Sequence, residues 1–91
     1  MSDRTAVEST VLDILEDVLN ASEDELRAQP VLAAHDWDSL SQLEVLAQLE
    51  SRLAITLDLR AYQAAREVDD LVGLVAGLVD AARALPTTVQ S

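Results

Sequence analysis

Cysteine and lysine are absent from this sequence, and glycine and proline each occur only twice. Without cysteine the chain forms no disulfide, builds no thiolate zinc site and has no thiol nucleophile of its own. An absence of disulfides fits a reducing compartment, and we expect a cytoplasmic protein. The scarcity of glycine and proline, the residues that most often interrupt regular structure, favours long helices.

Positive charge is also scarce. Six arginines stand against seventeen carboxylates, and the formal net charge is −11. Such a chain repels the phosphates of nucleic acids and of anionic lipids, so we exclude both as main partners. We expect a monomer that attracts basic protein surfaces.

No hydrophobic run is long enough to cross a bilayer. The longest, residues 71–79, is far shorter than the roughly 20 residues that a spanning helix needs. The first ten residues, MSDRTAVEST, have no apolar segment after a basic start, so we expect no signal peptide. Of the 91 residues 49% are hydrophobic, which suffices for one small domain with one core.

Hydrophobic residues at intervals of three and four predict an all-α fold, a bundle of three long helices and one short one. We expect helices from about residue 3 or 6 to 19, from 38 or 39 to about 53, from 58 to 65, and from 69 or 70 to 86. The last helix should bury a stripe made of Leu71, Leu74, Val75, Leu78 and Val79. Residues 1–86 would form the domain and residues 87–91 a disordered tail.

The connection over residues 20–37 is long for so small a domain. Ser22 and Glu25 match a capping box, which predicts one short helical turn inside it. Val31 and Leu32 are expected to anchor the connection to the core. Loops of this length are usually functional or partly structured.

The helix expected at residues 39–53 has two apolar arcs, at about 100° of rotation per residue. One arc holds Gln42, Val45, Leu46, Leu49 and Leu53, and the other, beside Ser39, holds Leu40, Leu43 and Ala47. The first arc faces the core. The second arc, flanked by Glu44 and Glu50, is either covered by the long connection or the short helix, or stays exposed and docks partners.

Ser39 stands where this helix begins, and two interpretations compete. Serine and aspartate are favoured at helix starts because their side-chain oxygens accept free backbone N–H groups, so Asp38-Ser39 alone is a weak signal. The same free N–H groups and the positive end of the helix dipole would also favour a phosphodiester on Ser39 Oγ.

The surrounding residues resemble the acyl carrier protein family, which includes the peptidyl and aminoacyl carrier proteins. The resemblance covers nearly the whole chain. It rests on Asp38-Ser39-Leu40, on Leu43, Glu44, Leu46, Leu49, Glu50 and Leu53, and on Val68-Asp69-Asp70-Leu71. Length, acidity and the long first loop agree with it.

The resemblance implies that Ser39 receives 4′-phosphopantetheine from coenzyme A through a phosphopantetheinyl transferase. The terminal thiol of this arm would then carry an acyl or aminoacyl group as a thioester. Asp38 would help to present the site to the transferase and its magnesium. A loading enzyme (an acyltransferase or an adenylating enzyme) and downstream acyl-transfer enzymes would dock on a surface made of Asp38, Leu40, Leu43, Glu44, Ala47 and Glu50. The chain itself would not be an enzyme and would have no catalytic or metal-binding residues.

Two departures from the family pattern bear on the pathway. His35, Asp36 and Trp37 stand where many members have a glycine. Gln48, Ser51 and Arg52 replace some of the acids that are usual in housekeeping fatty-acid carriers. Both differences favour a discrete carrier in polyketide or nonribosomal peptide biosynthesis.

Two other functions are compatible with the sequence. In the first, the chain is an acidic helical interaction module and Ser39 is only a helix cap. In the second, Ser39 is the nucleophile of a hydrolase, for which no convincing base is evident, because the one histidine, His35, is expected to be a loop residue. Trp37 should pack beside Ser39, and Tyr62 should be half-buried.

Overall fold

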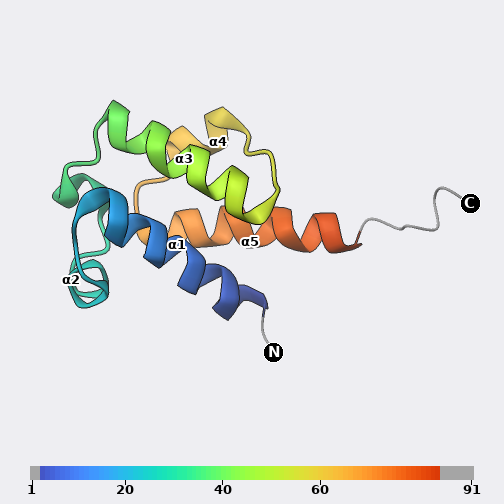
Figure 1. The fold of residues 1–91 in the computed structure, drawn as a ribbon, viewed down its shortest axis with the longest axis horizontal. Coiled ribbons are helices and arrows are strands. Elements are labelled where there is room, and N and C mark those ends of the chain that lie inside the picture. The colour runs from blue at the N-terminus through green and yellow to red at the C-terminus, as the bar shows by residue number, and fades with distance from the viewer. Residues whose placement is uncertain (1–2, 85–91) are drawn as a thin grey trace, which may run out of the picture.

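The computed structural model describes residues 3–84 and is all-α over that range. Figure 1 shows the helices, which are α1 (Asp3–Leu19), α2 (Glu23–Ala28), α3 (Ser39–Leu53), α4 (Leu59–Ala64) and α5 (Val68–Ala84), with a 3₁₀ turn at Leu32–His35. The predicted all-α bundle with three long helices is confirmed, and residues 3–84 contain two short helices, α2 and α4, where one short helix was expected. The tail that we expected at residues 87–91 lies outside the described residues.

The long connection contains a complete helix. Ser22 Oγ accepts a hydrogen bond from the Glu25 N–H, and the Ser22 N–H donates to Glu25 Oε1 at 2.8 Å, so the predicted capping box starts α2. Leu32 is fully buried and anchors the connection. The same expectation for Val31 was wrong, because 39% of its surface is exposed.

The start of α5 differs by one or two residues from the expected one. Neither Asp69 nor Asp70 precedes the helix, which begins at Val68. Asp70 instead reaches back from the first turn, and its carboxylate accepts the N–H groups of Arg66 and Glu67, each at 3.0 Å. This is the backward half of a capping box, in which the acid at the third position of the helix accepts the N–H of the residue before the helix.

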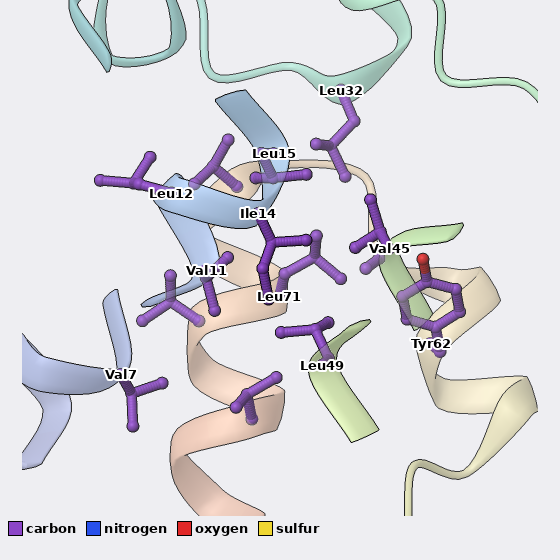
Figure 2. Packing of buried hydrophobic residues seen from close by; sticks show 14 of the residues in the cluster. Val7, Val11, Leu12, Ile14, Leu15, Leu32, Val45, Leu49, Tyr62 and Leu71 are labelled. Carbon is purple, nitrogen blue, oxygen red and sulfur yellow. The ribbon is translucent and has the colours of Figure 1, made fainter. Parts of the chain in front are cut away.

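The core forms where α1, α3 and α5 meet, and Figure 2 shows its side chains converging from these helices. Val11, Ile14, Leu15, Val45, Leu49, Leu71 and Val75 have no exposed surface. Full burial of one such side chain stabilises the fold by roughly 1.5–3 kcal/mol. In α5 the buried face is made of Leu71, Val72, Val75 and Ala76, while the expected core residues Leu74, Leu78 and Val79 are only partly buried.

Candidate functional site

Asp38, and not Ser39, caps α3. Asp38 has an extended backbone, and its Oδ1 accepts the N–H of Ser41 at 2.8 Å. Ser39 is therefore the first residue of the helix. Within residues 3–84 its Oγ makes no hydrogen bond, and the side chain is exposed. The hypothesis that Ser39 serves only as a helix cap was wrong, because the neighbouring carboxylate already occupies that role.

The electrostatics of this helix start favour an ionised Asp38. The hydrogen bond from the backbone N–H of Ser41 lowers the pKa of the Asp38 carboxyl below its usual value. A negative charge at this end of α3 also interacts favourably with the helix dipole. The exposed hydroxyl of Ser39 thus follows directly after a carboxylate that stays charged well into the acid range.

The segment before Ser39 is tied to the bundle at two points. The side chain of Gln42 donates from Nε2 to the Trp37 carbonyl at 3.3 Å. The ring of Trp37 meets the ring of Tyr62 edge-on, with centroids 6.1 Å apart. Trp37 therefore packs beside Ser39 as predicted, and it holds the start of α3 against α4.

Tyr62 is more deeply placed than we expected. Only 2% of its surface is exposed, so the prediction of a half-buried side chain was wrong. Its hydroxyl donates a hydrogen bond to the main-chain carbonyl of Gln42, which lets the polar end of the ring be buried at low cost. Burial raises the pKa of the phenol above its ordinary value, so Tyr62 is neutral across the physiological range.

An open recess of about 180 Å³ lies beside Ser39, between α3 and α4. It is lined by Ser39, Gln42, Leu43 and Leu46 from α3 and by Leu59, Tyr62 and Gln63 from α4. Leu43 and Leu59 form its exposed rim, since 60% and 50% of their surfaces are accessible. Tyr62 closes its inner end, because it is the buried member of the set. The sequence had not drawn attention to Leu59 or Gln63, since neither differs in type from other surface positions.

The second apolar arc of α3 is exposed. Leu40 has 68% of its surface accessible and Leu43 has 60%, and Ala47 and Glu44 are exposed as well. Neither the long connection nor α4 covers them. We call Leu40, Leu43 and Ala47 the exposed stripe.

Glu50, at the far end of this stripe, has a structural contact that its position in the sequence did not reveal. It is half-buried, and its Oε2 accepts the N–H of Leu57 at 2.9 Å. Leu57 is buried in the loop that follows α3. Of the two flanking acids, Glu44 is therefore the freely exposed one.

Other polar residues have structural contacts. His35 Nε2 lies 2.6 Å from the Gln29 carbonyl, and His35, which we expected in a loop, is the last residue of the 3₁₀ turn within the long connection. Arg27 bonds to Glu23 at 2.7 Å and to Glu8 at 3.5 Å, which ties α2 to α1. Among residues 3–84, no group of three or more histidine, aspartate or glutamate side chains is arranged to hold a metal ion. No helix within that range is both long and apolar enough to cross a membrane.

The geometry agrees with a comparison to known protein families. The family model described as "Phosphopantetheine attachment site" matches residues 9–75, which include Ser39, the recess and most of the core. The chain belongs to this family. Its domains carry 4′-phosphopantetheine covalently attached to a serine, so the predicted resemblance to acyl carrier proteins and the predicted cofactor are confirmed. Comparisons with curated proteins and with solved structures gave no match.

The residues around Ser39 fit a phosphopantetheine arm. The arm is amphipathic, with a phosphate, methyl groups and amides in order from the attachment point. The recess offers apolar contact from Leu43, Leu46 and Leu59, and the exposed amide of Gln63 offers a donor and an acceptor. A phosphate on Ser39 would lie at the positive end of α3. This phosphopantetheine-binding domain thus combines a free hydroxyl with a surface suited to the group.

Proposed function

We propose that Ser39 is the attachment site and that the chain is a discrete acyl or aminoacyl carrier protein. The observation that carries the proposal is that Asp38, and not Ser39, caps α3. Ser39 Oγ is therefore left exposed and without a hydrogen-bond partner among the described residues. The other serines in the matched region are Ser9, Ser22, Ser41 and Ser51. Of these, Ser22 is engaged in the capping box of α2, and none of the four begins a helix beside the recess.

Attachment exchanges a phosphoanhydride bond for a phosphoester bond. Ser39 Oγ forms a bond to the phosphorus that bears the pantetheine in coenzyme A, the phosphoanhydride bond breaks, and adenosine 3′,5′-bisphosphate leaves. Since no described side chain hydrogen-bonds to Ser39 Oγ, the base that takes the hydroxyl proton belongs to the transferase. Asp38, ionised and exposed, lies next to the reacting serine, where it favours approach of the transferase with its magnesium.

The arm supplies the thiol that this cysteine-free chain lacks. When bound, it holds acyl groups as thioesters. The protein's own residues then act by presentation, since they position the arm beside the recess and offer a surface that enzymes recognise. A covalent shuttle of this kind needs no catalytic residues, and we propose that the chain is not itself an enzyme.

Carrier domains work with a phosphopantetheinyl transferase and with acyl-handling enzymes. We propose that these partners dock on Asp38, Leu40, Leu43, Glu44, Ala47 and Glu50. The exposure of the stripe supports this proposal, because an apolar strip rimmed by a carboxylate is typical of a protein interface. Glu44 is the acid best placed to steer a basic partner, since Glu50 also holds the loop after α3.

For the pathway we propose polyketide or nonribosomal peptide biosynthesis, with a loading enzyme that is an acyltransferase or an adenylating enzyme. Gln48, Ser51 and Arg52 make α3 less acidic than in housekeeping fatty-acid carriers, and the engagement of Glu50 reduces its free charge further. Docking would therefore depend more on the exposed leucines than on charge.

The attachment site can be tested by intact mass. The protein is incubated with coenzyme A, magnesium and a broad-specificity phosphopantetheinyl transferase. The mass should rise by one phosphopantetheine group, Ser39→Ala should abolish the rise, and the matched variant Ser41→Ala should retain it. An unchanged wild-type mass, under conditions that modify a control carrier, would refute the proposal.

A further inference from the structure

The recess beside Ser39 is closed on its inner side by Tyr62. Tyr62 is its buried lining residue and is also a member of the hydrophobic core, so this side chain borders both the recess and the interior. Figure 2 shows the ring reaching from α4 toward α3, near Val45. Val45 and Leu49, on the inner side, have no exposed surface. A group that moved inward from the recess would have to pass this ring.

The Tyr62 ring is held in place from two directions. Its hydroxyl donates to the Gln42 carbonyl at 2.5 Å, and its ring and the Trp37 ring pack in an edge-type arrangement. Swinging it aside would leave a buried hydroxyl without its acceptor and would separate the two aromatic rings, and both changes cost free energy.

The recess is also small. A volume of 180 Å³ is close to the volume, on the order of 150 Å³, of an engineered apolar cavity that holds one benzene. It therefore takes one short segment of a flexible chain. Its lining combines leucines with the amide of Gln63, which suits a segment that carries methyl and amide groups, as the arm does. An additional acyl group does not fit in the same space.

We infer that Tyr62 bars the cargo from the interior of the bundle, so that a segment of the arm occupies the recess while the acyl group stays at the surface whatever its length. This inference rests on the proposed attachment at Ser39. It makes Tyr62 a positioning residue that sets how the cargo is presented. The carrier would then not select its cargo by size, and selection would fall to the loading enzyme.

The test uses acyl groups of increasing length. Short, medium and long straight-chain acyl-pantetheine groups are transferred from the acyl-coenzyme A esters by a broad-specificity transferase, and intact mass confirms loading. The rate of thioester cleavage by hydroxylamine and the Tm are then measured for each form. If the cargo stays outside, the cleavage rate and the Tm do not depend on chain length. If it enters the core, cleavage should slow by up to about fourfold for each added methylene. Burial of one methylene shifts the equilibrium between exposed and buried cargo by about that factor. A wild-type protein that shows this slowing overturns the inference.

Variants at Tyr62 test whether the ring is the barrier. Tyr62→Phe keeps the ring, and its cleavage rate should remain independent of chain length. Tyr62→Ala opens a path, and cleavage should then slow as the cargo lengthens. If circular dichroism shows Tyr62→Ala to be unfolded, Tyr62→Leu replaces it. If the folded Tyr62→Ala or Tyr62→Leu protein is still cleaved at a rate that does not depend on acyl length, Tyr62 is not the barrier. A failed attachment appears earlier, as a loading mass that does not rise, and is thereby distinguished from a failure of this inference.

Discussion

The hydroxyl of Tyr62 donates a hydrogen bond to the main-chain carbonyl of Gln42, at 2.5 Å. This contact joins the short helix α4 to the beginning of α3, three residues after Ser39. Gln42 in turn donates from its side chain to the Trp37 carbonyl, so the residues before and after Ser39 are held by one connected set of contacts. The position of the candidate attachment site therefore depends on α4 as well as on α3.

Removal of the Tyr62 hydroxyl should weaken this connection without emptying the core. Tyr62→Phe should lower the free energy of unfolding by about 0.5–1.5 kcal/mol, since one hydrogen bond is lost and the ring remains. Tyr62→Ala should lower it by about 3–5 kcal/mol, because a large cavity forms. Urea unfolding followed by the fluorescence of Trp37, the one tryptophan, measures both. Equal losses for the two variants would contradict a packing role for the ring.

The two apolar arcs of α3 should respond differently to the same substitution. Leu49→Ser should destabilise by at least 2 kcal/mol, roughly the lower end of the range for losing a buried aliphatic side chain, and should bury a hydroxyl as well. Leu43→Ser should change stability by less than about 0.5 kcal/mol, because the side chain is largely exposed, but should speed dissociation of partners. Thermal melts and surface-binding kinetics with a transferase check both. A Leu43→Ser melt as low as that of Leu49→Ser would place the stripe in the core.

Substitutions of the two acids beside the exposed stripe, Glu44 and Glu50, should also have different effects. Glu44→Arg should slow association with a basic partner and flatten its dependence on salt, while the Tm stays close to that of the wild type. Glu50→Ala should lower the Tm, because the Leu57 N–H loses its acceptor. Stopped-flow association rates at several salt concentrations, together with melts, provide the comparison. Wild-type association of Glu44→Arg would show that charge on α3 does not guide the encounter.

Ala47 in α3 and Ala54, the residue just after it, should give opposite results when replaced by glycine. Ala54 ends the helix in the left-handed region, with φ 54° and ψ 46°, where a Cβ is strained. Ala54→Gly should stabilise the domain by up to about 1 kcal/mol. Ala47→Gly, on the exposed face of the same helix, should destabilise by roughly 0.5–1 kcal/mol through the entropy of the unfolded chain. Chemical denaturation measures both, and a loss of stability in Ala54→Gly would refute the strain.

The cap of α5 should make stability depend on pH. The N–H groups of Arg66 and Glu67 lower the pKa of Asp70 below its unfolded value of 3.8. The stabilisation is therefore complete above that value and is lost as the pH falls through the lower, folded value. The Tm of Asp70→Ala should lie below that of the wild type at neutral pH, and the gap should close in acid. A gap that persists unchanged at the lowest pH at which both proteins fold would exclude the carboxylate as its cause.

Local chemistry in the sequence was sufficient for the helices, and a family resemblance was sufficient for the cofactor. The spacing of Val7, Val11, Ile14 and Leu15 predicts a helix with one apolar face, and Ser22 with Glu25 predicts a helix start, because the forces concerned act within one or two turns. Asp38-Ser39 alone was a weak signal, and the phosphopantetheine site was predicted from a resemblance that extends from Asp38 to Leu71. The family match confirms the cofactor that this resemblance predicted.

Other features depend on contacts between segments that are distant in sequence. In α5 nearly every side is apolar, so periodicity could not show that Val72 and Ala76 would be more deeply buried than Leu74 and Leu78. Whether Asp38 or Ser39 caps α3, and whether Glu50 is free, depended on backbone geometry at Ser41 and Leu57. The burial of Tyr62 required an acceptor twenty residues away in the chain, since a phenol enters a core at low cost only where the fold has placed a carbonyl to meet its hydroxyl.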